Sequence, residues 1–309
     1  MFISVVIPTY NRRAILEKCL KSLESQDVCP EIEKYEVIVV DDGSTDGTFE
    51  WIKNNSSVLP HVRVLVQDHG GAAAGRNRGV KNSKGDVIVF IDSDLVVTPK
   101  FLSSHAKTIS KNWKKKGHKL CFTYGAVINT NNFENPTSEN FKVQDISWAY
   151  FATGNVAIDK KLLVRSGLFD TVFRLYGWED LELGERLRSM GVELVNCPNA
   201  VGYHWHPAFK IDQIPDLIRI EKERAKMGLV FYRKHPTFRV RLIIQFTLFH
   251  LCLWELLTLG GLVNVKSLRP LLAFLVRKGQ SGLAMEILRL PLNRLGVKEI
   301  YREAAAIGL

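Results

Sequence analysis

The feature that most constrains this chain is the regular alternation of short apolar runs with helical segments in its N-terminal part. Runs rich in β-branched residues, typical of buried strands, occupy residues 3–7, 37–40, 62–66 and 86–91. Apolar residues at helical spacing predict helices between them, at residues 14–25, 45–54 and 72–82. Ser44 or Thr45 is expected to cap the second helix. Strands that alternate with helices form βαβ units, so we predict an α/β fold with a mostly parallel sheet flanked by helices.

Polar residues follow three of these strands at the point where each strand ends, at residues 8–11, 41–44 and 92–94. In such sheets ligands bind outside the carboxyl ends of the strands, so these loops form the candidate site. The residues exclude two common nucleotide-binding motifs. The first strand is not followed by GxGxxG, and the glycine-rich residues 69–79 lack the Gly-Lys-Ser/Thr end of a P-loop.

Three groups of residues could carry chemistry. Asp92 and Asp94 follow an apolar strand, and two carboxylates at this spacing suit Mg²⁺ or Mn²⁺, although a solvated turn has the same residues. Residues 177–183 place three acids after a Gly-Trp pair that could form a pocket wall, but the dipole of the helix predicted there also favours acids. His204 and His206 stand two apart on a strand-like run, so both could face one metal ion or form a partly buried pair.

Together these motifs resemble the nucleotide-sugar glycosyltransferases of family 2, which have the GT-A fold. The resemblance covers residues 2–206 and rests on Pro8-Thr9-Tyr10-Asn11, the sequence VVDDGSTD at 39–46, Arg76-Asn77, Asp92-Ser93-Asp94, Gly154-Asn155 and Trp178-Glu179-Asp180. The Gly-Trp-Glu-Asp segment also resembles the acceptor-side motif of galactosyltransferase-type enzymes. In one departure, Gly75 stands where the family often has alanine before the Arg-Asn pair.

The resemblance implies a role for each donor-side residue. Thr9 and Tyr10 would line the base pocket, with Tyr10 stacked on uracil or another base, and Pro8 before them would belong to the donor site. Asp42 would accept a hydrogen bond from the base, as a carboxylate can from an N–H donor. Arg76 would neutralise part of the diphosphate.

The resemblance also implies a metal site. Asp92 and Asp94 would hold the ribose and the metal, with Asp94 as the direct ligand and Ser93 between them in the donor site. His204 would be the third protein ligand and His206 the alternative, because imidazole is compatible with Mn²⁺. The implied cofactor is Mn²⁺ or Mg²⁺.

On the acceptor side, the resemblance implies that Asp180 is the base that takes the proton of the acceptor hydroxyl. Glu179 would position the acceptor, next to Trp178 and Gly154. The expected activity is metal-dependent inverting transfer of a sugar from a nucleoside-diphosphate donor, a UDP-sugar, to a hydroxyl of a glycan or lipid-linked acceptor. A nucleotidyltransferase acting on sugar phosphates is an alternative, distinguished by release of pyrophosphate. A basic nucleic-acid-binding protein is another, but it leaves the acids at the strand ends unexplained.

The net charge of +10 is concentrated near the C-terminus, since residues 1–206 carry +1 and residues 207–309 carry +9. We therefore expect a catalytic domain at 1–206 and a basic, apolar helical region at 207–309, with an amphipathic helix at 214–234.

Residues 242–265 contain Glu255 as their only charged residue and are long enough to span a bilayer. Gln245, His250 and Glu255 would then lie in the membrane, and basic residues flank both ends of the run. Gly260-Gly261 is also expected to end the helix early. We expect the region to lie on an anionic membrane surface, with packing on the catalytic domain or a second subunit, and a true span, as alternatives.

The five scattered cysteines lack CxxC spacing and favour a reducing compartment. The N-terminus has no basic segment before its apolar run, which resembles a first strand more than a signal peptide. These features predict a cytoplasmic protein, peripheral at the inner face of the membrane. They predict no nucleic-acid partner and leave a homo-oligomer open.

Overall fold

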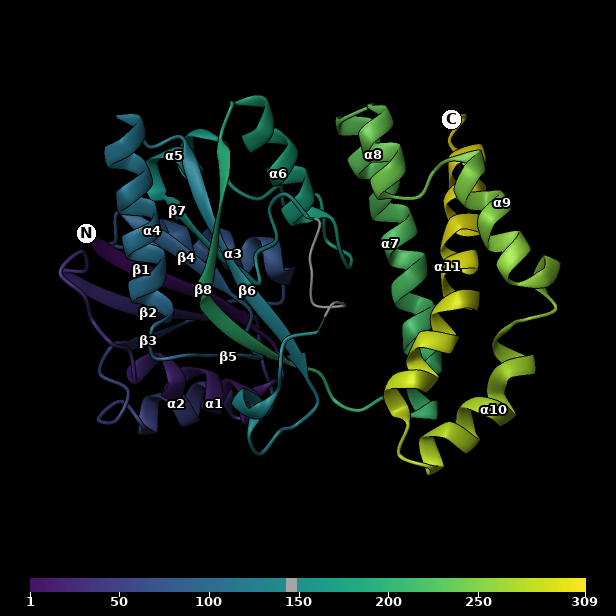
Figure 1. The fold of residues 1–309 in the computed structure, drawn as a ribbon, viewed down its shortest axis with the longest axis horizontal. Helices are drawn as coiled ribbons and strands as arrows, with labels where there is room; N and C mark the ends of the chain where they lie inside the picture. The colour runs from purple at the N-terminus through teal and green to yellow at the C-terminus, as the bar shows by residue number, and fades with distance from the viewer. Residues whose placement is uncertain (143–148) are drawn as a thin grey trace. The chain divides into compact units, whose positions relative to one another are not determined.

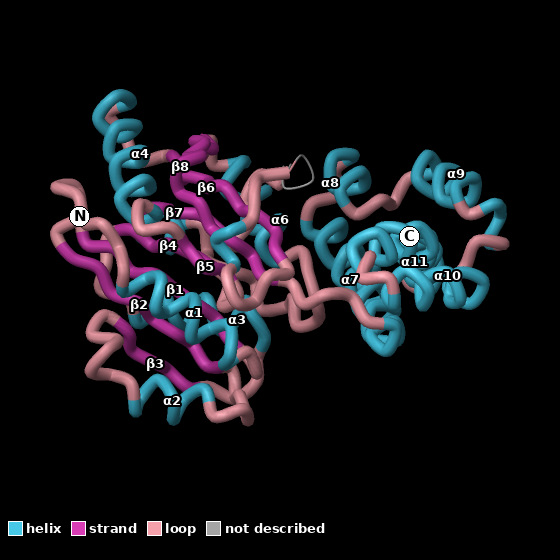
Figure 2. Tube along the Cα trace, turned by 60° about the horizontal axis from the view of Figure 1, so that its bottom comes forward, coloured by secondary structure: helices cyan, strands magenta, loops and turns pink. Residues whose placement is uncertain are grey.

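The computed structural model describes residues 1–142 and 149–309. The chain divides into two compact units. The first contains residues 1–174 and 179–206, and the second contains residues 175–178 and 207–309. Every described strand belongs to the first unit, whereas the second consists of helices and loops (Figures 1 and 2).

An eight-stranded sheet forms the centre of the first unit. In chain order its strands are β1 (Phe2–Thr9), β2 (Lys34–Asp41), β3 (Val62–Val66), β4 (Val87–Ile91), β5 (Leu95–Val97), β6 (Cys121–Thr130), β7 (Asn155–Asp159) and β8 (Glu193–Trp205). Their order in space is β3-β2-β1-β4-β7-β6-β8-β5.

The sheet is mixed. The pairs β1–β2, β2–β3, β1–β4 and β6–β8 are parallel. The pairs β4–β7, β6–β7 and β5–β8 are antiparallel. The four strands predicted from the N-terminal alternation therefore form a parallel half-sheet, and the antiparallel pairs arise beyond them.

Helices cover both faces of the sheet, because alternate residues of each central strand point to opposite sides. One face packs against α1 (Arg13–Glu24), α2 (Thr48–Asn54) and α4 (Phe101–Lys116). The other packs against α3 (Gly71–Asn82), α5 (Lys160–Arg165) and α6 (Glu179–Ser189). In β1, Val5 faces the first cluster and Val6 the second, so the α/β prediction is confirmed at the level of single residues.

One local prediction is wrong. Helix α2 begins at Thr48 and not at Thr45, and neither Ser44 nor Thr45 caps it. The reason is that both of these residues bond to Asn11 in the loop after β1, while Asp46 accepts a hydrogen bond from the Thr48 amide.

The structure also has elements in a polar range to which the sequence assigns none. Residues 111–142 hold the end of α4, all of β6 and the short helix η1 (Pro136–Ser138).

A network of buried polar groups joins the strands β6, β7 and β8 to helix α4, which covers one face of the sheet. Asn155 Nδ2 donates to the carbonyl of Ala200, 2.8 Å away, and its Oδ1 lies 2.8 Å from His105 Nε2. Burial lowers the pKa of His105 to about 4, so its ring is neutral and Nε2–H donates to the amide oxygen. Gly125 lies at the register shift between β6 and β8, against the same atoms.

Gly125→Ala is expected to destabilise the first unit by about 1–3 kcal/mol. An added Cβ would lie 2.4 Å from the Ala200 carbonyl oxygen and from the Asn155 amide, so the strand or the network must move. Urea unfolding followed by circular dichroism measures the change. Gly282→Ala is the control, because no atom lies within 4 Å of its added Cβ. Equal stability of both variants would contradict the prediction.

The second unit is built from helices. They are the short η3 (Ile211–Gln213), α7 (Ile214–Lys234), α8 (Phe238–Ile243), α9 (Leu248–Leu257), the short η4 (Leu259–Gly261), α10 (Val265–Arg277) and α11 (Ser281–Ala306). Helix α7 has the bounds predicted from its amphipathic pattern. Within this unit α11 packs against α7, α9 and α10 (Figure 1).

The apolar segment 242–265 does not form one continuous helix. Residues Phe238–Leu257 are long and apolar enough, by length and composition, to cross a membrane. However, they comprise α8 and α9, which are separated at Gln245, where φ is 60°. Gly260 and Gly261 also have positive φ, so the predicted break at this pair is confirmed.

Candidate active site

Two carboxylates lie at the carboxyl end of β4, in the middle of the sheet. Asp92 follows the last residue of β4, and Asp94 precedes β5 and is 3% exposed; Ser93 between them is buried. Strand β5 pairs antiparallel with β8, so that Leu95 stands opposite His204. This pairing brings His204 Nε2 to 2.9 Å from Asp94 Oδ1.

Asp92, Asp94 and His204 form a candidate metal site. One ligand atom from each residue lies within 4.8 Å of the others. Two carboxylates and one imidazole fit Mn²⁺, and the carboxylates also suit Mg²⁺. Gly154 lies beside the cluster, where a side-chain Cβ would come within 3.3 Å of Asp92 Oδ2, so glycine keeps this side of the carboxylate open.

Arg12, which the motif analysis did not single out, also contacts this cluster. Its guanidinium forms an ion pair with Asp94 Oδ2, and about half of the Arg12 side chain is exposed. Burial raises the pKa of Asp94, but the hydrogen bond and charge of His204 and the charge of Arg12 outweigh burial and lower it overall. Asp94 therefore carries its negative charge at neutral pH.

His206 lies beside this cluster, outside its three ligands. Its Nε2 is 3.1 Å from Asn129 Oδ1, and its ring centroid is 4.2 Å from that of His204. Burial, and then the charge of His204, lower the pKa of His206 to about 4. The geometry thus favours His204 over His206 as the metal ligand.

Arg76 connects the carboxylates after β4 with the acids of α6. The side chain is 5% exposed. Its Nη2 lies 3.0 Å from Asp92 Oδ1, and its Nη1 lies 2.9 Å from Glu179 Oε1. The structure therefore shows Arg76 positioning two carboxylates, and its contact with a diphosphate stays a prediction.

Asp180 lies in the first turn of α6, next to Glu179, where the helix dipole favours acids. Its Oδ1 accepts a hydrogen bond of 2.8 Å from the Leu181 amide. Burial, and then the charge of Glu179, raise the pKa of Asp180 to about 7. A carboxylate with this pKa can accept a proton near neutral pH and release it again.

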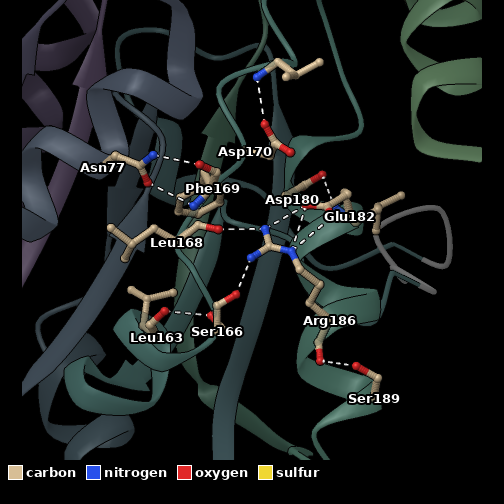
Figure 3. A network of polar contacts seen from close by, with 12 residues as sticks. Asn77, Leu163, Ser166, Leu168, Phe169, Asp170, Asp180, Glu182, Arg186 and Ser189 are labelled. Carbon is tan, nitrogen blue, oxygen red and sulfur yellow. Dashed lines mark hydrogen bonds and ion pairs between the residues drawn. The ribbon is translucent and has the colours of Figure 1, made fainter. Parts of the chain in front are cut away.

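A second arginine, Arg186, holds α6 in place through hydrogen bonds and an ion pair (Figure 3). Arg186 Nη2 lies 2.7 Å from Glu182 Oε2 and 2.6 Å from the Leu168 carbonyl oxygen, and Nη1 donates to the Ser166 carbonyl. Glu182 is buried, so this ion pair is largely shielded from water. The contacts fix α6, and with it Asp180, against the loop that follows α5.

The predicted base pocket lies at the ends of β1 and β2. Thr9 is buried, and its hydroxyl has no hydrogen-bond partner among the described residues. Tyr10 is half exposed, and its ring lies 4.4 Å from the ring of His69. Pro8 belongs to β1 and is half-buried. The positions of Thr9 and Tyr10 are compatible with a bound base.

Asp42 has a different environment from the one expected. Oδ1 accepts hydrogen bonds from Gln67 Nε2 at 2.6 Å and from the Gly70 amide at 2.9 Å. Oδ2 accepts one from the Gly71 amide at 2.8 Å and lies 2.9 Å from His69 Nδ1. A carboxylate has about four acceptor sites, and these contacts use them. In this structure Asp42 anchors the loop before α3, and its bond to the base stays a prediction.

Trp178, the predicted acceptor-side aromatic, belongs to the second unit. Its Nε1 donates to the Arg224 carbonyl oxygen at 2.7 Å, and its ring stacks on Phe231. Its backbone has φ of 78°, immediately before α6 begins. Contact of Trp178 with an acceptor stays a prediction.

Sequence reasoning missed Arg12, Gln67 and His69. Arg12 had a usable signal, since it follows the polar end of β1 in Asn11-Arg12-Arg13. Gln67 and His69 had none, because only the fold of the loop brings them to Asp42.

Comparison with known proteins agrees with this fold. Residues 4–167, more than half of the chain, match the family model "Glycosyl transferase family 2". An uncharacterized glycosyltransferase of Bacillus subtilis, YfnE, is 27% identical over 66% of this chain and 65% of its own length. A chondroitin synthase of Escherichia coli is 30% identical over 67% of this chain and 35% of its own length. The chain thus spans only part of these curated relatives.

A mannosyltransferase of Pyrobaculum calidifontis, solved with GDP-Man and Mn²⁺, has a similar fold. It aligns with a TM-score of 0.62 and 20% identity, over 96% of this chain and 85% of that one. The likeness in structure extends to the helical second unit, and the family match covers most of the first. The chain therefore belongs to glycosyl transferase family 2 and has the GT-A fold.

Proposed function

We propose that this glycosyltransferase uses a divalent metal ion to transfer a hexose from a UDP-sugar, with inversion, to a hydroxyl of a glycan or lipid-linked acceptor. The motifs at the strand ends, the family membership and the metal-bound mannosyltransferase support the use of a nucleoside-diphosphate sugar. The galactosyltransferase-like character of Gly-Trp-Glu-Asp belongs to the same proposal.

One observation carries the proposal: Arg76 connects the candidate metal ligands with the candidate base. It bonds to Asp92 of the Asp92–Asp94–His204 cluster and to Glu179, which precedes Asp180. A single buried guanidinium thus holds a donor-side carboxylate and an acceptor-side carboxylate in one site. A transferase needs this arrangement, since donor and acceptor must meet at one carbon.

In the proposed reaction, ionised Asp180 accepts the proton of the acceptor hydroxyl. The hydroxyl oxygen forms a bond to the anomeric carbon of the sugar. The bond from this carbon to the diphosphate oxygen breaks on the opposite face, and its electron pair leaves with the nucleoside diphosphate. Glu179, held by Arg76, positions the acceptor.

Asp92, Asp94 and His204 would hold the metal ion, either Mn²⁺ or Mg²⁺. When bound, such an ion supplies positive charge that stabilises the departing diphosphate. The nucleotidyltransferase and nucleic-acid-binding alternatives lose their support, because the chain belongs to a glycosyltransferase family.

The proposal is tested with a panel of UDP- and GDP-sugars, each with Mn²⁺, with Mg²⁺ and with a chelator. We expect metal-dependent release of a nucleoside diphosphate from one UDP-sugar. NMR of the product with a glycan acceptor then gives the configuration of the new bond. Release of pyrophosphate, turnover in the chelator or retention of configuration would each contradict part of the proposal.

The pH dependence of transfer should follow Asp180. Because the base must be ionised, the rate is low below the pKa of Asp180, rises through about pH 7 and levels off above it. Turnover at saturating donor and acceptor, measured between about pH 5.5 and 8.5 at constant ionic strength, gives this profile. A rate that stays constant through pH 7 would argue against Asp180 as the base.

A further inference from the structure

The second unit exposes an unusual number of large apolar side chains on α9, η4 and α10. We call these residues, together with the cations described below, the α9–α10 surface. Its apolar members are Leu248, Phe249, Leu256, Leu257, Leu259, Leu262, Leu271 and Phe274. Leu256 is 73% and Leu262 is 75% exposed. Large apolar side chains exposed along successive helices indicate a protein or membrane interaction site.

These side chains lie on consistent faces of the helices. In α9, Leu256 lies seven residues after Phe249 and eight after Leu248, which is about two turns, so the three share a side. In α10, Leu271 and Phe274 share a side, whereas Leu272 and Leu275 point into the core formed with α11. The exposed residues thus lie on the solvent-facing sides of these helices, and other sides of the same helices pack within the unit.

Positive charge surrounds the apolar part. Residues 233–280 contain eight Lys or Arg residues and a single acid, Glu255. Exposed cations lie at both ends of α10, and none of them has an ion pair with a residue that the structure describes: Lys266, Arg269, Arg277 and Lys278. Cations without acidic partners around an apolar face match a surface that is negatively charged outside and apolar beneath.

The single acid is paired with cations of the same unit. Glu255 Oε1 lies 2.7 Å from Lys298 Nζ and 3.1 Å from Arg294 Nε, and both partners belong to α11. The negative charge of Glu255 is therefore compensated within the second unit.

The break between α8 and α9 favours a segment that lies on a bilayer over one that crosses it. Helix α9 has 10 residues, which rise by about 15 Å, half of the roughly 30 Å hydrocarbon layer. The turn at Gln245 and the glycines at 260 and 261 prevent extension at either end.

We propose that the α9–α10 surface binds an anionic lipid bilayer in the plane of its headgroups, with the apolar side chains inserted and the cations at the phosphates. This inference does not depend on the proposed donor or acceptor, because it rests on the second unit alone. The experiment that tests this inference measures binding to vesicles and does not depend on turnover.

The full chain is mixed with vesicles of phosphatidylcholine, or of phosphatidylcholine with phosphatidylglycerol, and floated through a density gradient. We expect binding to the anionic vesicles at low salt and much weaker binding at about 1 M salt, where the Debye length is about 3 Å. Absence of binding to anionic vesicles at low salt overturns the proposal, as does equal binding to neutral ones.

Charge variants separate this surface from the overall positive charge. The test variant removes the four cations of α10: Lys266→Gln, Arg269→Gln, Arg277→Gln and Lys278→Gln. The control removes four exposed cations of the first unit: Lys53→Gln, Lys111→Gln, Lys114→Gln and Lys115→Gln. At about 1 kcal/mol per cation, we expect vesicle affinity to fall on the order of a thousandfold in the test variant. An equal loss in the control overturns the proposal.

A variant that replaces exposed apolar side chains distinguishes binding to a membrane from binding to a second copy of the chain. Phe249→Ser with Leu256→Ser should weaken vesicle binding by about tenfold or more, whereas Val28→Ser with Val58→Ser, also at exposed positions, should not. Light scattering reports the mass of each variant. If Phe249→Ser with Leu256→Ser converts a dimer to a monomer and leaves vesicle binding intact, the surface is an interface between copies and the proposal is wrong.

Discussion

Asp180→Asn is expected to lower the rate of sugar transfer by about 10³-fold, while the affinity for the donor and for Mn²⁺ stays unchanged. Asparagine has nearly the same shape and can keep the hydrogen bond from the Leu181 amide. It cannot accept a proton, so the acceptor hydroxyl must attack without a base, and general-base catalysis contributes about 10²–10⁴-fold. Steady-state turnover and calorimetric donor titration measure the two effects separately.

Asp27→Asn is the control for this change, since Asp27 is exposed and lies outside the site. It removes the same charge and should leave the rate unaltered. The rise of rate near pH 7 should disappear in Asp180→Asn. If donor affinity falls as much as the rate, Asp180 acts in donor binding, and the base must be sought elsewhere.

The α/β architecture could be predicted because it depends on a repeated pattern. Four β-branched runs separated by amphipathic segments leave few ways to bury both faces of a sheet. The polar residues at the strand ends then had to gather at one edge, as Asp92 and Asp94 do at the end of β4. For the same reason α7, with a regular apolar stripe, matches its predicted bounds.

Strand β6 shows where this reasoning fails. Its sequence, Cys121–Thr130, has neither a long β-branched run nor strict alternation, and it stands in a polar region. It becomes a strand because it pairs with β7 on one side and β8 on the other. Such pairing is a tertiary effect, which local sequence does not encode.

In the site, the places of residues in the fold were easier to predict than their hydrogen-bond and ion-pair partners. Arg76 and Asp42 were expected to face the donor; Asp42 directly follows β2, and Arg76 lies within α3, as predicted. Yet Arg76 bonds to Asp92 and Glu179, and Asp42 bonds to the loop of Gln67–Gly71. A buried charge must be paired, and which group pairs with it depends on distances that only the fold sets.

Asp94→Asn is expected to weaken Mn²⁺ binding by more than about a hundredfold and to lower transfer in proportion. The change removes the negative charge of the most buried carboxylate in the cluster. Even the loss of a residue that only supports a metal ligand costs about 10–100-fold in metal affinity, so loss of a ligand should cost more. Electron paramagnetic resonance of free Mn²⁺ measures binding without any turnover.

The two histidines provide a matched pair for this prediction. His204 lies 2.9 Å from Asp94, whereas His206 contacts Asn129. His204→Ala should therefore reduce Mn²⁺ affinity as Asp94→Asn does, and His206→Ala should leave most of it. The opposite order would assign the ligand to His206. If all three variants bind Mn²⁺ as the unaltered protein does, the metal lies elsewhere, and the carboxylates after β4 serve only to hold Arg12 and Arg76.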